Sequence, residues 1–217
     1  MGVMAQISSV CRVAQLMPDS GTVGVTAIDK RPLDEPVLVK KLGLYGDVQA
    51  DRTHHGGTDK AVYAFADEDA AHFEGLLDRV VEPGLFGENL RTQGLDVTGA
   101  VIGERWHVGE KLILEVTMPR TPCGTFARRM GEQQWVKRFT AEGRPGAYLR
   151  VVRAGAVAEG DGILVSDRPA HGVTIGDVFG GLTAAAAQRL LAGAAAGGRV
   201  AEPVLDAASR AAARLSA

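Results

Sequence analysis

Short runs of alternating apolar and polar residues dominate the chain up to about residue 166. Runs of this length, bounded by glycine, proline or aspartate, are typical of β-strands. The runs that fit cover residues 7–14, 22–28, 36–39, 45–50, 60–66, 101–102, 105–108, 111–117, 147–152 and 162–165. We expect the first two runs to pair as a hairpin, because the residues between them have the composition of a turn, and we expect residues 30–32 to form a loop.

Helical periodicity interrupts these strands and then replaces them after residue 166. The expected helices cover residues 67–80, 121–130, 133–141, 174–182, 183–196 and 203–215. Strands outnumber helices before residue 166, and there is no regular alternation of strand and helix, so the pattern favours a β-barrel over a doubly wound sheet. We therefore predict a mainly β fold with helices (α+β), in which a barrel domain at residues 1–166 precedes a three-helix domain at residues 167–217.

Composition narrows the classes of protein and of function. The 217 residues are 46% hydrophobic and 23% charged, as in an ordinary soluble globular protein. The formal net charge of −2 and the pI of about 6.2 argue against a nucleic acid polymer or an anionic membrane as partner. Two cysteines are too few for a disulfide scaffold, a zinc site or an iron–sulfur cluster, and no leader or membrane span is recognisable, so we expect a cytoplasmic protein.

The stretch MPRTPCGTFARRM, at residues 118–130, carries the strongest candidate for chemistry. Thr121 is a plausible N-cap, which places Cys123 in the first turn of the following helix, with Arg120 just before it. A helix N-terminus and cationic neighbours lower the pKa of a thiol, and a thiolate is a nucleophile or a soft metal ligand. The alternative is that Cys123 is a small buried apolar residue, as we expect for Cys11.

A second candidate is the polar loop between the expected strands at residues 45–50 and 60–66. Arg52, His54, His55, Asp59 and Lys60 surround two adjacent glycines, Gly56 and Gly57, whose N–H groups could approach an anion closely. The spacing of a nucleotide-binding P-loop is absent. The loop is therefore either a phosphate cradle or a solvated hairpin tip, and only one of the two adjacent histidines can face a site on one side of a strand.

Four linked motifs resemble the MOSC domain, and specifically its stand-alone bacterial YiiM-type group. They are GLYGDVQADRTHHGG, LFGENL, PRTPC and GAYLRVVRAGAVAEGD, in this order along the chain. The resemblance covers about residues 5–166, and the C-terminal helices are similar to the small helical domain of that group. It implies a strongly bent β-barrel that binds a molybdenum cofactor.

The same resemblance implies the site residues and the activity. Cys123 would coordinate molybdenum and act as the catalytic residue. The residues that would bind the cofactor are Arg52, His55, Gly56, Gly57, Lys60, Asn89, Thr92, Arg120 and Thr121. This chain has Arg91 directly after GENL, where many relatives have a small hydroxyl residue, so either Arg91 or Thr92 would contact the cofactor. The implied chemistry is reduction of N-hydroxylated compounds, including hydroxylamino bases and amidoximes, with a role in detoxification; pyridoxal phosphate binding is a family-wide association only.

Two other functions fit the same motifs. Cys123 could carry a persulfide, as a sulfur carrier would, or the barrel could bind and deliver the cofactor without catalysis. A reductase would also need a separate electron-donating protein, because the chain has neither a dinucleotide-binding GxGxxG turn nor cysteines for an iron–sulfur cluster. The C-terminal helices are a candidate docking surface for that donor, and homodimer formation is left open.

Overall fold

One curled, eight-stranded sheet forms the largest part of the structure. The structure is a computed structural model that describes residues 5–49 and 56–214. The strands follow the order β13 (Ile163–Ser166), β9 (Arg105–Val108), β10 (Leu112–Pro119), β11 (Ala147–Arg153), β7 (Val62–Ala66), β8 (Leu90–Gln93), β1 (Gln6–Val13) and β4 (Lys30–Pro32). Neighbouring strands are antiparallel except β7 and β8, which are parallel.

The two ends of this sheet approach each other. The backbone N–H of Ile7, in β1, donates to the carbonyl of Asp161 at 2.8 Å, and the N–H of Gly160 donates back to Ile7 at 2.8 Å. Because Asp161 lies just before β13, these bonds bring β1 close to the other end of the strand order. The predicted α+β class is confirmed, and the predicted strongly bent β-barrel is present as a curled sheet whose two ends are joined by a few bonds rather than by a continuous ladder.

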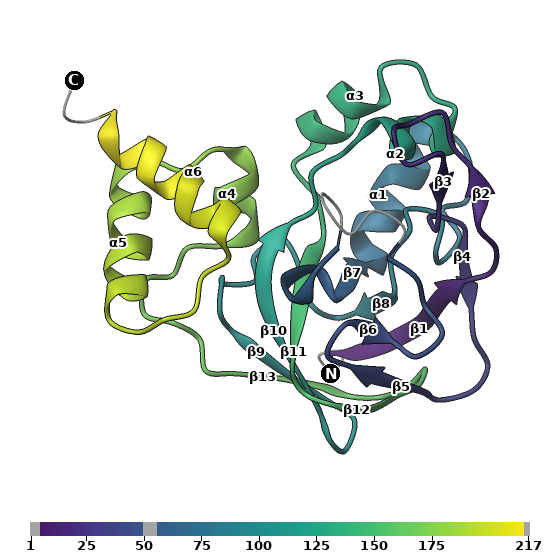
Figure 1. Cartoon of the computed structure of the whole chain (residues 1–217), viewed down its shortest axis with the longest axis horizontal. Helices are drawn as coiled ribbons and strands as arrows, with labels where there is room; N and C mark the ends of the chain where they lie inside the picture. Colours follow the sequence, from purple (N-terminus) through teal and green to yellow (C-terminus); the bar gives the residue numbers. More distant parts are fainter. Residues whose placement is uncertain (1–4, 50–55, 215–217) are drawn as a thin grey trace.

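Two small sheets and six α-helices complete the described part of the chain (Figure 1). The small sheets are β12 (Gly155–Val157), β5 (Val37–Lys40) and β6 (Gly43–Leu44), and the hairpin of β2 (Met17–Pro18) with β3 (Val25–Thr26). The helices are α1 (Asp67–Leu77), α2 (Gly124–Met130), α3 (Trp135–Glu142), α4 (Ile175–Gly180), α5 (Ala184–Ala195) and α6 (Glu202–Ala213). Helices α1 to α3 lie together at the top of Figure 1, and α4 to α6 form a separate group beside β9 and β10. None of the helices in the described ranges has the length and apolar character needed to cross a membrane.

The core has an aliphatic and an aromatic part. The aliphatic part fills the curled sheet and continues without interruption into α4, α5 and α6 through Ile175, Leu190 and Val204. We call the second part the aromatic cluster; it consists of Phe65, Phe73, Phe86, Phe126, Trp135 and Phe139. Its ring centroids lie as close as 5.1 Å, in tilted, edge-to-face and stacked pairs that each add about 0.5–1.5 kcal/mol beyond simple burial. The cluster fastens α1, α2 and α3 to the sheet.

The predicted hairpin between residues 7–14 and 22–28 is wrong. Strand β1 pairs instead with β8 and with β4, which was expected to be a loop. Ser9, Val10 and Cys11 are consecutive and all buried, so β1 needs a covered position within the sheet. The short, partly exposed β3 pairs only with β2. Residues 45–49 also contain no strand, because that segment is used for turns around the cavity described below.

Helix starts were predicted with mixed success. The helices expected from residues 174 and 183 begin there: Thr174 caps α4 in a capping box with Asp177, and the Thr183 side chain caps α5. At the cysteine, however, α2 begins only at Gly124, so Cys123 is the N-cap residue and Thr121 lies before the helix. Extended backbone at Cys123 (φ −128°, ψ 173°) is the physical reason, because helical hydrogen bonding cannot begin until the chain turns.

Candidate functional site

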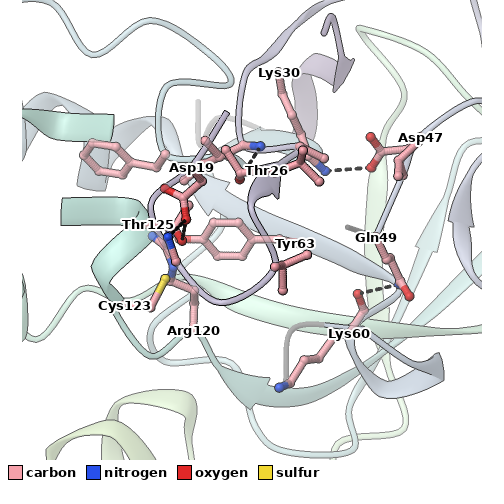
Figure 2. A pocket seen from close by; sticks show the side chains of 18 of the residues that line it. Asp19, Thr26, Lys30, Asp47, Gln49, Lys60, Tyr63, Arg120, Cys123 and Thr125 are labelled. Carbon is pink, nitrogen blue, oxygen red and sulfur yellow. Dashed lines mark hydrogen bonds and ion pairs between the residues drawn. The ribbon is translucent and has the colours of Figure 1, made fainter. Parts of the chain in front are cut away.

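A cavity of about 540 Å³ opens between the β2–β3 hairpin, the start of α2 and the sheet (Figure 2). A volume of this size lies within the range of about 300–1,000 Å³ that small-molecule and cofactor sites occupy. The polar residues that line it are Asp19, Thr22, Thr26, Lys30, Asp47, Gln49, Lys60, Tyr63, Asn89, Arg120, Cys123, Thr125, Arg128 and Tyr148. Segments far apart in the sequence therefore meet around one space.

Cys123 reaches this cavity because a short extended link joins β10 to α2. Strand β10 ends at Pro119, and the following three residues lead to the N-cap position that Cys123 occupies. The Cys123 side chain is half-buried and lies beside Arg120 in Figure 2. Phe126 and Met130 of the same helix are buried in the core, so the packing of α2 holds the thiol at the cavity wall.

Arg120 is the most unusual charged residue of the cavity. Its side chain is 5% exposed, and its guanidinium carbon lies 3.5 Å from the ring centroid of Phe126 and 5.4 Å from that of Tyr63. Such stacking orients a guanidinium without using its N–H donors. One terminal nitrogen, Nη1, is buried and has no hydrogen-bond partner among the described residues. A buried donor without a partner costs about 1–3 kcal/mol, so this geometry suits a polar or anionic ligand that would accept from it.

Lys60 enters the cavity from a 3₁₀ turn, η1 (Thr58–Lys60). The Gln49 side chain holds the segment that carries this turn. Its amide donates to the carbonyls of Gly57 at 3.4 Å and Lys60 at 3.3 Å, and its carbonyl accepts from the Gly57 N–H at 2.9 Å. Gly57 has φ 97°, a conformation that favours glycine, so the residue type is required there.

The wall opposite Cys123 contains a buried ion pair. Lys30 Nζ lies 2.6 Å from Asp47 Oδ2, and both side chains are 10% exposed. Burial opposes ionisation of Asp47, but Lys30, the Asn89 amide and the Val13 N–H together hold the pKa of its carboxyl below the usual value. Asp47 therefore stays ionised and fixes Lys30 in this wall.

The β2–β3 hairpin is fastened to α2 by what we call the Asp19 clamp. Asp19 accepts from Arg128 Nε at 2.8 Å and Nη2 at 2.7 Å, and from the Thr125 hydroxyl at 3.0 Å. The hydrogen bonds from Arg128 lower the pKa of the Asp19 carboxyl from 3.8 to about 2. Val23 and Val25 of the same hairpin are exposed toward the cavity, which gives this wall an apolar surface.

The Asp19 clamp should stabilise the fold at neutral pH and lose its effect only in strong acid. Because the pKa is about 2 in the folded chain and close to 3.8 without the clamp, the stabilisation is complete above about pH 4 and disappears as the pH falls toward 2. The free energy of unfolding of wild type minus that of Asp19→Asn, measured by urea denaturation across this range, should follow that course. A difference that has already vanished at about pH 5 would contradict the clamp.

The structure brings four of the predicted site residues to the cavity: Lys60, Asn89, Arg120 and Cys123. Arg52, His54 and His55 lie outside the described residues. Gly56 and Gly57 belong to the segment that precedes η1 but do not line the cavity.

Thr121 and Thr92 are not placed at the cavity. Thr121 is exposed before α2, and Thr92 is fully buried in β8. Arg91 Nε pairs with Glu88 at 2.6 Å, and Arg91 does not line the cavity. Of the two alternatives after the GENL motif, neither Arg91 nor Thr92 is therefore a residue of this cavity.

Asn89 lines the cavity, but the fold uses most of its side-chain hydrogen bonds. Its carbonyl accepts from the Tyr63 N–H at 3.2 Å, and its amide donates to the Cys11 carbonyl at 3.2 Å and to Asp47 at 2.8 Å. Asn89 therefore joins β1, β7 and the Asp47 segment. The hydrogen bonds of Asn89 therefore shape the cavity wall. The fold also uses the neighbouring Glu88, whose carboxylate accepts from the Gly84 N–H at 2.7 Å.

Four further residues of the cavity lining were not predicted from the sequence: Asp19, Lys30, Asp47 and Gln49. Asp47 and Gln49 lie within the GLYGDVQ motif, so their motif membership was a usable signal, whereas Asp19 and Lys30 lie in segments that read as turn and loop. No cluster of three or more histidine, cysteine or acidic side chains that could hold a metal ion by itself occurs in the part of the chain that the structure describes.

Comparison with known proteins identifies the class. The MOSC domain family matches residues 51–164, which is more than half of the chain. The chain belongs to the MOSC domain family, as its motifs predicted.

Three relatives share about a third of their aligned residues with this chain. The uncharacterised protein YflK of Bacillus subtilis (strain 168) is 33% identical over 150 residues, which are 69% of this chain and 67% of YflK. Protein YiiM of Escherichia coli (strain K12) is 32% identical over 137 residues, 61% of this chain and 60% of YiiM. A protein of Gibberella moniliformis (strain M3125 / FGSC 7600) named reductase is 33% identical over 150 residues, but these are only 26% of that protein.

Solved structures confirm the YiiM-type architecture. YiiM from Geobacillus stearothermophilus superimposes with a TM-score of 0.75 at 24% identity, over 95% of this chain and 98% of that one. YiiM from Escherichia coli superimposes with a TM-score of 0.70 at 18% identity, over 96% of this chain and 93% of that one. Because these matches cover nearly the whole chain, the C-terminal helices are part of the shared fold.

Proposed function

We propose that this chain is a molybdenum-cofactor-dependent reductase of N-hydroxylated compounds such as hydroxylamino bases and amidoximes. Its membership of a family associated with the molybdenum cofactor supports the cofactor class, and a relative named reductase supports the reaction class. The observation that carries the proposal is that the Cys123 thiol and the buried Arg120 guanidinium, with one donor unpaired, face the same cavity.

The residues of the cavity fit this cofactor. A cysteine thiolate is a soft ligand suited to molybdenum, and Cys123 supplies the only cysteine sulfur of the cavity lining in the described ranges. Arg120 and Lys60 supply positive charge for a phosphate or oxo group, with Arg120 Nη1 as an available donor. When bound, the cofactor would supply the two-electron chemistry that removes oxygen from nitrogen.

The residues of this chain would then bind and orient the reactants. Cys123 would hold the metal, and the packing of α2 in the aromatic cluster would keep the thiol in place. Val23 and Val25, in the β2–β3 hairpin, would receive the apolar part of a substrate and exclude water from it. The Asp19 clamp would keep that hairpin next to the metal ligand.

Metal analysis together with an activity assay tests the proposal. Protein produced in a host that makes the cofactor should contain molybdenum and should reduce an N-hydroxylated base when a chemical reductant is supplied. Transferable sulfane sulfur on Cys123 without turnover would favour a persulfide carrier instead. Tightly bound cofactor without turnover would favour a delivery protein.

We also expect that NADH or NADPH alone cannot drive the reaction. The chain has no dinucleotide-binding turn and no cysteine set for an iron–sulfur cluster, so electrons must come from a separate reductase. Cofactor-loaded protein should be inactive with a nicotinamide alone and active after addition of a flavin- or ferredoxin-type reductase or of a chemical reductant. Turnover with the purified chain and a nicotinamide alone would contradict this expectation.

A further inference from the structure

A row of alternating charges runs across the sheet to the C-terminal helical segment and includes Asp59, the residue before the cavity lysine Lys60. The row, which we call the charge row, consists of Asp167, Arg105, Glu115, Arg150, Asp59 and Arg199. Its successive N–O distances are 3.5, 3.3, 3.4, 3.5 and 3.2 Å. Glu115 is the direct cross-strand neighbour of both Arg105 and Arg150, so these three side chains share one face of the sheet.

Arg150 lies at the centre of the charge row and is 3% exposed. Burial lowers the pKa of its guanidinium, and the carboxylates of Asp59 and Glu115 offset part of that effect. A buried cation is stable only when carboxylates compensate it, so Arg150 holds the Asp59 carboxylate in place. Arg150 Nη2 also donates to the Arg199 carbonyl at 3.5 Å, which ties it to the segment between α5 and α6.

Asp59 links the charge row to the cavity, because it is the middle residue of η1 and directly precedes Lys60, which lines the cavity. The Thr117 hydroxyl of β10 donates to the Asp59 carbonyl at 2.6 Å. On the other side, Arg199 Nη2 donates to the Asp59 carboxylate at 3.2 Å. Arg199 lies outside residues 51–164, the part that matches the MOSC family, yet it contacts the residue next to a cavity lysine.

We propose that the C-terminal helical segment is a working part of the binding site, in which Arg199 positions Lys60 through Asp59. The helices pack on the same continuous core as the sheet, so Arg199 is presented from a fixed surface. Loss of the Arg199 contact leaves the Asp59 carboxylate paired with Arg150 alone and loosens η1. The inference rests on the proposed function only for the identity of the anion that Lys60 binds.

Hydrogen exchange on the chain without cofactor tests the positioning role directly. The Arg199 side chain is 65% exposed, so Arg199→Ala should leave the urea midpoint unchanged while amide exchange at residues 58–61 rises by about three- to fivefold, as expected for one exposed ion pair. Arg199→Glu places a like charge beside Asp59 and should give a larger rise. Arg199→Lys should restore protection.

The second measurement is retention of molybdenum after dialysis of cofactor-loaded protein, which should fall in Arg199→Glu and in Asp59→Asn. The matched control is Arg189→Glu, because Arg189 belongs to the same segment and contacts only the His171 carbonyl among the described residues, at 3.0 Å. Unchanged exchange at residues 58–61 in Arg199→Glu would overturn the inference, as would faster exchange without faster loss of molybdenum. Absence of molybdenum from wild type would instead count against the proposed function, and the exchange result would still decide the positioning role.

Discussion

Replacing Cys123 by serine should abolish molybdenum-dependent turnover while leaving the chain folded. An alcohol is a poor ligand for a soft metal, and removing a direct ligand should cost more than the roughly 10–100-fold that follows loss of an outer-sphere partner. Cys123 is the N-cap of α2 without a side-chain capping bond, so serine in its place removes no contact that starts the helix. Turnover and molybdenum content per folded chain are the measurements.

Cys11→Ser is the control for this prediction. Cys11 is fully buried in β1, and burial raises the pKa of its thiol to about 12, so it is not a thiolate at neutral pH. The substitution should lower the free energy of unfolding by about 1–3 kcal/mol, because it buries a more polar group beside the Ser9 hydroxyl in the core. Turnover per folded molecule should not change. Full activity of Cys123→Ser, or equal losses in both variants, would remove Cys123 from the site.

Replacing Arg120 by methionine should speed the loss of cofactor by roughly 10–100-fold. This is the size expected when one charge-assisted hydrogen bond, worth about 1.5–3 kcal/mol, is lost. Methionine removes the charge and the N–H donors, while its flexible apolar side chain can still pack against Phe126. Because the substitution also removes a buried donor that has no partner among the described residues, the free energy of unfolding without cofactor should stay equal or rise.

This opposite response of retention and stability is the signature of a ligand-binding arginine. Arg138→Met is the matched control, since Arg138 also lies over an aromatic ring, that of Trp135 at 6.0 Å, but outside the cavity lining. It should leave retention unchanged. If Arg120→Met loses stability and keeps its cofactor, Arg120 is structural and the cationic end of the cavity is assigned incorrectly.

Local signals predicted the elements whose formation depends on neighbours in sequence. The starts of α4 and α5 were predicted at residues 174 and 183, and Thr174 and Thr183 cap backbone groups three residues ahead there. The pairing of β1 could not be predicted in this way, because its partners are chosen by burial in the assembled sheet. Two-residue strands such as β2 and β3 carry almost no periodicity.

In the candidate site, too, one group of residues could be predicted from a local motif and another could not. Cys123 and Arg120 belong to one motif of unusual composition, so the sequence marked them together. The rest of the cavity lining depends on contacts between distant residues. Lys30 and Asp47 are 17 positions apart, and Asp19 and Arg128 are 109 positions apart. In the sequence these residues resemble the solvated charges of any loop, and only the folded chain turns them into a wall.

Two walls of the cavity come from different parts of the chain. The thiol and its arginine come from the link between β10 and α2, whereas Val23, Val25, Lys30 and Asp47 all precede the residues that match the family. Substitutions at Val23 and Val25 can therefore change the apolar surface of this wall without altering the link that carries Cys123 and Arg120.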